Sequence, residues 1–188
     1  MHWDVPEQLG TAMDGRGYDF LIYCGWRSMA GGCTSLQETY VTGGSWIDAF
    51  WRTLCIDVDC CTSKRADASM ERLYDLWWWA ELLSQPDSRR EHAAFQAYTT
   101  TNNAEELELL MAFIRPHELP RIHDLHDHIR SSTMRRRFFI SKKGYIGLAP
   151  ANAQIGDVVS IIHGGNVPYV LRRKAVEIPG GGILQTGN

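Results

Sequence analysis

The polar residues that could do chemistry are concentrated in one segment and scattered elsewhere. The dense segment covers residues 117–128, where four histidines and two aspartates occur in the sequence HELPRIHDLHDH. Imidazole and carboxylate groups are ligands for zinc or ferrous iron. On a helix, His123 would share a face with Asp127, and Asp124 would share another with His128. The spacing matches no HExxH motif, so we expect a solvated polar helix face. A metal-dependent enzyme using His117–His128 is kept as the third functional hypothesis.

A second set of candidates consists of single polar side chains placed near aromatic ones. Arg52 directly follows Trp51. An arginine beside a pocket would hold a carboxylate or a carbonyl by charge-assisted hydrogen bonds, and its alternative is a salt bridge. The candidate catalytic residues are Arg52, Tyr145, His163 and Tyr169, and the candidate substrate-binding residues are Trp51, Trp77, Trp78 and Arg172. Arg172 has the alternative of a salt bridge across a strand or turn.

The cysteine spacing and the absence of common catalytic motifs argue against a resident cofactor. The five cysteines are Cys24, Cys33, Cys55, Cys60 and Cys61, and no CxxC motif occurs. Cys60 and Cys61 are adjacent, which from the sequence alone is a poor zinc chelate. GxSxG, P-loop and HExxH motifs are also absent. We therefore predict reduced thiols, no metal and no cofactor.

Two helices are expected to position the aromatic candidates. Ser45 is a good N-cap for a helix in which Phe50 and Leu54 lie on one apolar face. The next helix is predicted over residues 65–84, and its centre, Leu76–Ala80, is apolar on nearly every face. Its three adjacent tryptophans project about 100° apart. At least one of them is therefore expected to line a cavity or to lie on the surface.

The remaining elements complete an α+β chain. Further helices are predicted over residues 88–98 and 104–114, whereas the apolar run of residues 18–26 fits either a strand or a short helix. From Arg135 to Lys174, short β-branched and aromatic runs alternate with turns that contain glycine or proline, which indicates an antiparallel meander. Asp157, after Gly156, is expected to accept backbone N–H groups in a turn.

These elements predict one domain over residues 1–188. Its helical N-terminal part would pack on a C-terminal meander or a small, partly open barrel. The predicted segments are a loop-rich start with one candidate strand (1–44), a mainly helical part (45–133), the meander (135–174) and a frayed tail (175–188).

The meander resembles the C-terminal region of fungal heterokaryon-incompatibility (HET-domain) proteins. The matching residues are Arg136, Arg137, Phe138, Phe139, Gly144, Tyr145, Gly147, Leu148, Pro150, Gly156, Asp157, Val159, Gly164, Gly165, Val167, Pro168, Val170, Leu171 and Arg172. Upstream, Ala49–Leu54 is similar to the FWRTL segment of that family. The HET domain itself is expected to be absent.

Proteins similar to this region alone occur in fungal natural-product pathways, and they imply the first functional hypothesis. It is a cofactor-independent pericyclase, an intramolecular Diels–Alder cyclase acting on a hydrophobic terpenoid or polyketide intermediate. A cycloaddition needs no nucleophile or base, and restricting the substrate's conformation accelerates it. The alternative is a non-catalytic HET-type interaction module, whose exposed tryptophan surface would bind a protein partner.

Composition limits the partners. The net charge of −3 does not favour nucleic acid. No apolar run approaches the ~20 residues of a membrane span, and the first residues do not form a secretory signal. We therefore predict a cytoplasmic protein that does not bind nucleic acid or span a membrane. The resemblance adds a hydrophobic small-molecule substrate as the expected partner, with a homodimer as one option.

Overall fold

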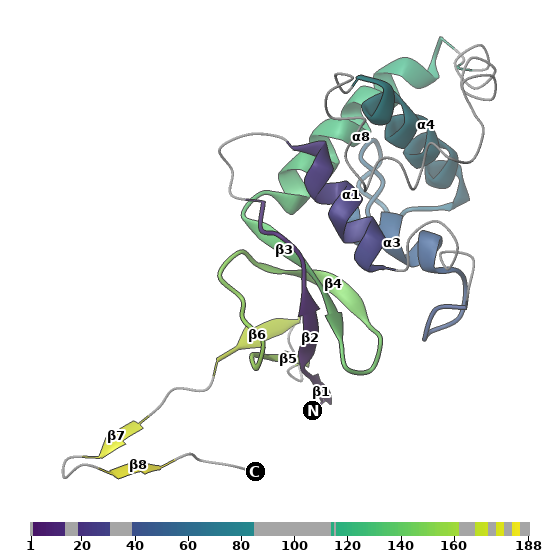
Figure 1. Ribbon diagram of the computed structural model, residues 1–188. Coiled ribbons are helices and arrows are strands. Elements are labelled where there is room, and N and C mark those ends of the chain that lie inside the picture. Colours follow the sequence, from purple (N-terminus) through teal and green to yellow (C-terminus); the bar gives the residue numbers. More distant parts are fainter. Residues whose placement is uncertain are drawn as a thin grey trace.

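Helices and small sheets occupy different parts of the molecule, as the computed structural model shows (Figure 1). The structure describes residues 2–13, 19–30, 39–84, 114, 116–161, 168–172, 176–178 and 182–184. The predicted α+β class is confirmed. The helix predicted over residues 88–98, nearly all of the one over 104–114, and His163 lie outside these described residues.

Within the described residues, four helices form the helical part. They are α1 (Phe20–Met29), α3 (Trp46–Leu54), α4 (Ala68–Ser84) and α8 (Glu118–Thr133). The ambiguous apolar run near the N-terminus is helical, and Asp19 caps it by accepting the Leu21 N–H at 3.1 Å. Ser45 caps α3 as predicted, with its hydroxyl accepting the Asp48 N–H at 3.1 Å. The following helix begins only at Ala68.

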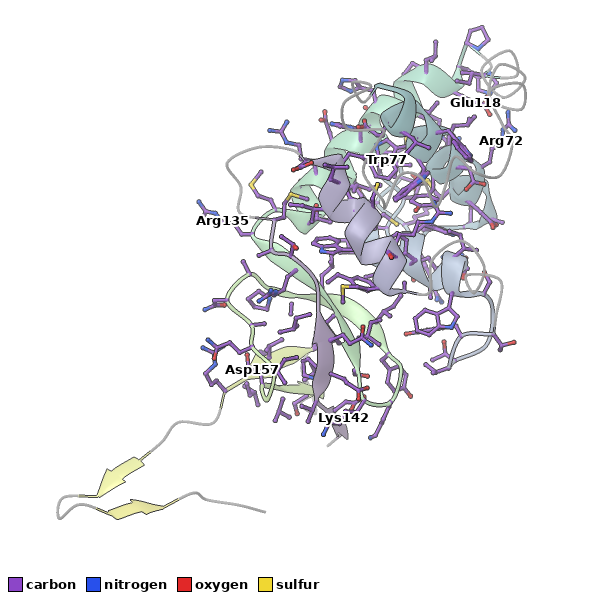
Figure 2. All side chains as sticks on the ribbon, viewed as in Figure 1. Arg72, Trp77, Glu118, Arg135, Lys142 and Asp157 are labelled. Carbon is purple, nitrogen blue, oxygen red and sulfur yellow. The ribbon has the colours of Figure 1, made fainter. Side chains whose placement is uncertain are left out.

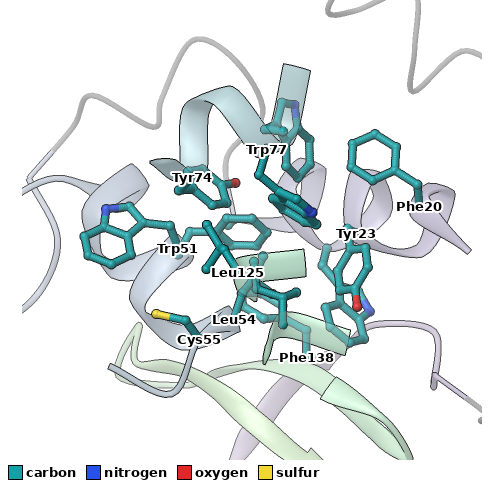
Figure 3. Close-up of a cluster of buried hydrophobic side chains, with 14 of the residues drawn as sticks. Phe20, Tyr23, Trp51, Leu54, Cys55, Tyr74, Trp77, Leu125 and Phe138 are labelled. Atoms are coloured by element: carbon teal, nitrogen blue, oxygen red, sulfur yellow. The ribbon is translucent and has the colours of Figure 1, made fainter. Parts of the chain in front are cut away.

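A continuous aromatic cluster forms the core between these helices (Figure 3). Trp77 and Trp78 are both buried, with about 1% of their surface exposed. Phe20 packs against both of them, with ring centroids 6.1 and 4.8 Å away. Trp79 is half-buried at the edge of the same cluster. Neighbouring tryptophans therefore enter one core here, because helices pack around α4 on more than one side.

Contacts between helices extend to the outer end of the bundle. Arg72 of α4 donates from Nε to the buried Glu118 carboxylate at 2.9 Å. Figure 2 shows the two side chains side by side. This pair joins α4 to the first turn of α8.

Six of the described strands form two three-stranded sheets instead of one meander. The strands are β1 (His2–Asp4), β2 (Pro6–Leu9), β3 (Arg136–Ser141), β4 (Ile146–Pro150), β5 (Val158–Ile161) and β6 (Tyr169–Leu171). Their antiparallel orders are β2-β3-β4 and β1-β5-β6. The prediction of a loop-rich N-terminus is therefore wrong at β1 and β2. One N-terminal segment joins both sheets, and the described strands do not close into a barrel.

The prediction of a frayed tail is also wrong where the tail is described. Strands β7 (Val176–Ile178) and β8 (Gly182–Leu184) pair antiparallel as a separate two-stranded sheet. In Figure 1 this hairpin lies apart from the two larger sheets. Among the described helices, none is both long and apolar enough to cross a bilayer.

Candidate functional site

The guanidinium of Arg52 is fixed at the end of α3 by four neighbours. Its Nε donates to both carboxylate oxygens of Asp48, one helical turn earlier, at 2.9 and 3.0 Å. Its Nη1 donates to Asp57 at 2.7 Å and to the Ala66 carbonyl at 2.6 Å. The Trp51 ring stacks below it, with Cζ 4.4 Å from the ring centroid. The alternative of a salt bridge for Arg52 is thus observed.

Asp57 connects Arg52 to a second arginine. Its other carboxylate oxygen accepts from Arg65 Nε at 2.7 Å. Burial alone would lower the pKa of Arg52, but the hydrogen bonds to Asp57 and Asp48 raise it overall. Arg52 is therefore a fixed cation at any physiological pH.

A cavity of about 570 Å³ opens beside this guanidinium. Its lining residues are Tyr40, Thr42, Gly43, Asp48, Ala49, Arg52, Thr53, Arg65 and Ala66. The Tyr40 hydroxyl accepts the Ile146 N–H at 2.9 Å. Burial raises the pKa of Tyr40, so its phenol keeps its proton. The cavity is thus bordered by a phenol and two guanidiniums.

Two of these donors have unused capacity. The part of the chain that the structure describes provides no acceptor for Arg52 Nη2 or for the Tyr40 hydroxyl hydrogen. A guanidinium N–H and a phenol O–H both donate to carbonyl or carboxylate oxygens. The arrangement therefore suits an oxygen-bearing ligand.

The other predicted catalytic residues are dispersed. Tyr145 is 37% exposed and precedes β4, and its phenol contributes to the raised pKa of Tyr40. Tyr169 is exposed on β6, in the other large sheet. Neither tyrosine lines the Arg52 cavity, and Tyr169 belongs to a different sheet.

Arg172 forms the salt bridge that was its alternative. It donates from Nε and Nη2 to Asp157 at 2.8 and 2.9 Å, and from Nη2 to the Asn152 carbonyl at 2.7 Å. Asp157 also accepts the Gln154 N–H at 2.8 Å, which confirms its predicted turn role. The hydrogen bond from Arg172 is the main reason that the pKa of Asp157 is lowered, although burial opposes it.

The predicted tryptophan walls lie in the core. Trp51, Trp77 and Trp78 are each about 1% exposed, and the Arg52 cavity is lined by other residues. At the boundary between the helices and β3, Phe50 packs on Phe138 with ring centroids 5.6 Å apart. The three tryptophans therefore contribute to core packing and are not among the residues that line the Arg52 cavity.

The histidines of α8 serve different partners. His123 pairs with Asp127 at 3.6 Å on the exposed face, as the spacing predicts. His126 Nδ1 lies 2.8 Å from the Glu81 carboxylate, and His128 Nε2 donates to the Cys55 carbonyl at 2.9 Å. Both rings are half-buried. The expectation of a wholly solvated face is therefore wrong for these two residues, which join α8 to neighbouring segments.

A smaller, more apolar cavity of about 340 Å³ lies between β2 and α1. Its lining residues are Leu9, Gly10, Thr11, Leu21, Ile22, Gly25, Trp26 and Met29. No sequence pattern indicated it, because its two walls are joined only by tertiary packing.

The fold and these cavities define a small α+β module with helices packed on short antiparallel sheets. Comparison with known families places the chain more specifically: residues 36–179 match the Het-6 beta-barrel domain, and the chain belongs to that family. This supports the resemblance to heterokaryon-incompatibility proteins. No curated protein and no solved structure matches the chain. The comparisons therefore do not support a relationship to Diels–Alderases.

Proposed function

We propose that this protein is a HET-type ligand-binding module whose Arg52 cavity binds a small molecule through a carboxylate or carbonyl oxygen. The observation that carries the proposal is the fixed Arg52 guanidinium with Nη2 unused by the described residues. Because Asp48, Asp57 and Ala66 already orient the group, little side-chain freedom is lost when a ligand binds.

Charge at the cavity favours a weakly charged ligand. The carboxylates of Asp48 and Asp57 offset the guanidiniums of Arg52 and Arg65. The remaining attraction is mainly directional hydrogen bonding from Arg52 and Tyr40. We therefore expect a ketone, an ester or a monocarboxylate, and weaker binding of phosphates.

A cyclase is the second candidate, and the shared position of Tyr40 and Arg52 favours it. Two donors at one cavity could polarise the carbonyl of an activated alkene. A hydrogen bond that involves a charged group contributes about 1.5–3 kcal/mol, and each ~1.4 kcal/mol of transition-state stabilisation is tenfold in rate. The cavity volume of about 570 Å³ is within the usual range for small-molecule sites.

A tryptophan-lined partner surface receives less support. The tryptophans with described side chains are buried or half-buried: Trp26, Trp46, Trp51, Trp77, Trp78 and Trp79. They do not form the exposed apolar patch that such a module would use.

Native mass spectrometry can test the proposal with terpenoid-sized monocarboxylic acids and α,β-unsaturated ketones as probes. Arg52→Lys keeps the charge but removes the fork, so binding should weaken by about 10-fold or more. Arg172→Lys is the matched control, because Arg172 also pairs with an aspartate but lies away from the cavity. Melting curves establish that both variants fold.

Three outcomes separate the candidates. A stoichiometric adduct that Arg52→Lys weakens and Arg172→Lys preserves supports the binding module. Conversion of a bound probe to an isomer of the same mass would add the cyclase activity. Failure to bind any probe, or binding that is insensitive to Arg52→Lys, would refute the site.

A further inference from the structure

The loop between α3 and α4 folds back on itself and brings sulfur and carboxylate groups together. Val58 and Arg65 form an isolated antiparallel bridge. Within it, the Asp59 N–H donates to the Lys64 carbonyl at 2.8 Å, and the Ser63 N–H donates to the Asp59 carbonyl at 2.9 Å. Cys60 and Cys61 lie in this tight turn.

The thiols of Cys60 and Cys61 lie close together although the two residues are neighbours in the sequence. Their sulfur atoms are 3.7 Å apart. One carboxylate oxygen of Asp59 completes a group of three candidate ligand atoms, all within 4.8 Å of one another. Adjacent side chains of an extended segment would point in opposite directions, so it is the turn that makes this pair converge.

The sulfur separation fits a tetrahedral ion. With Zn–S bonds of about 2.3 Å and a tetrahedral angle, two thiolates on one zinc ion lie about 3.8 Å apart. Asp59 is buried, with 7% of its surface exposed, and its Oδ1 is held by the Cys61 N–H at 2.8 Å. Cys61 is exposed, so an ion can enter from solvent.

We propose that Asp59, Cys60 and Cys61 form a binding site for a thiophilic divalent cation, with Zn²⁺ as the best fit. Three protein ligands leave the fourth position of a tetrahedral ion open, as in zinc sites that bind a water molecule or a substrate.

Charged residues of α8 complete the surroundings. Asp124 acts electrostatically on Cys60. Arg121 acts on Asp59 in the same way. Two thiolates and one carboxylate exceed the charge of Zn²⁺ by one unit, and the Arg121 cation offsets this excess.

Cobalt titration tests the site without any assumption about the Arg52 cavity. The full chain is kept reduced with a phosphine and titrated with Co²⁺, whose charge-transfer absorption reports thiolate coordination. We expect one Co²⁺ per chain, displaced by Zn²⁺. Cys61→Ser should lower this absorption at saturating Co²⁺, because only the Cys60 thiolate remains, and should weaken Zn²⁺ binding beyond the ~10–100-fold typical of losing an outer-shell partner.

Two further variants make the test specific. Asp59→Asn keeps an acceptor for the Cys61 N–H and should weaken binding by removing the charged ligand. Cys24→Ala alters a buried thiol elsewhere and should leave the titration unchanged. Because Cys61 is exposed, its serine variant should retain the wild-type melting temperature in the absence of metal.

Three results of the titration would overturn the proposed site. The absence of cobalt–thiolate absorption in the reduced wild-type chain would overturn the proposal. Unchanged affinity in Cys61→Ser would do the same. Loss of binding in a His123 variant, with Cys61→Ser unaffected, would move the ion to α8 and reject this site.

Discussion

Gly10→Ala should destabilise the protein because the position has no room for a Cβ atom. An added Cβ would lie 2.4 Å from Cδ1 and 2.6 Å from Nε1 of Trp26. Trp26 cannot yield easily: it is 1% exposed, stacks on Phe138, and donates from Nε1 to the Thr11 carbonyl at 2.8 Å. Overpacking costs about 1–3 kcal/mol, and weakening that hydrogen bond adds about 0.5–1.5 kcal/mol. We expect a loss of about 2–4 kcal/mol.

Gly25→Ala is the matched control because Gly25 lines the same apolar cavity. Nothing lies within 4 Å of a Cβ at Gly25. Since Gly25 is inside α1, alanine should stabilise the protein by about 0.5–1 kcal/mol through its higher helix propensity. The two changes should therefore have opposite signs.

Urea denaturation followed by tryptophan fluorescence gives both free energies of unfolding. For a chain of this length, the loss at Gly10 corresponds to a melting temperature lower by roughly 5–15 °C. The packing argument would be refuted if Gly10→Ala stayed within about 0.5 kcal/mol of wild type. It would also be refuted if both variants shifted stability in the same direction.

Two buried polar interactions give further predictions. Thr133 Oγ1 donates to the Ile129 carbonyl and therefore accepts a hydrogen bond from the Tyr23 hydroxyl at 2.6 Å. Tyr23→Phe removes this hydrogen bond and should lower the free energy of unfolding, measured by urea titration, by about 0.5–1.5 kcal/mol. An unchanged free energy of unfolding would contradict this assignment. The hydrogen bond from Arg172 lowers the pKa of Asp157 in the folded protein. The ionised Asp157 therefore contributes its full stabilisation above its unfolded-state pKa of about 3.9, and this stabilisation is lost as the pH falls through its folded-state pKa. The stability difference between wild type and Asp157→Asn should thus be constant near neutral pH and shrink below about pH 4, and a difference that grew in acid would refute the pairing.

Helix α3 shows what the sequence could predict. Its start depends on a local signal, the Ser45 side chain accepting the Asp48 N–H. Its buried face follows from the spacing of Phe50 and Leu54. Both signals lie within one short segment, so no distant partner is needed to recognise them. The turn role of Asp157 was predictable for the same reason.

The N-terminal strands show what the sequence could not predict. Segment β1 has three residues and β2 has four, and a register irregularity occurs between Pro6 and Gln8. Neither strand has an alternating pattern long enough to identify it. Their partners, β5 and β3, lie more than a hundred residues away in the chain. Their existence is decided by tertiary pairing, which composition and periodicity do not record.

The tryptophan interpretation failed for a related physical reason. Neighbouring side chains on a helix do project about 100° apart. This separation would keep Trp77 and Trp78 out of a shared core only if other elements packed on a single side of α4. Here Tyr74 lies within 6 Å of both indole rings, and α8 packs on the same helix. A helix enclosed on several sides can bury tryptophans that point in different directions.

The sequence predicted Arg52 as a candidate but not the loop that completes its site, because that loop contains non-glycine residues with positive φ angles. Ile56 and Asp57 adopt positive φ angles of 53° and 55°, although neither is glycine. A β-branched residue in this conformation is an outlier, and such strain costs about 1–3 kcal/mol per residue. The same turn places the Asp57 carboxylate against Arg52 and Arg65, and these interactions offset part of that cost.

The same loop also contains the Cys60–Cys61 pair, and Ser63, in the turn that follows this pair, has a positive φ angle of 55°. Both proposed sites therefore lie on one strained loop. Predictions from sequence assume that each residue adopts its preferred backbone conformation, and Ile56 and Asp57 do not. Violations of local preference are expected to concentrate at functional sites. The strain in this loop is therefore a physical reason to look for function between α3 and α4, rather than among the tryptophans of the core.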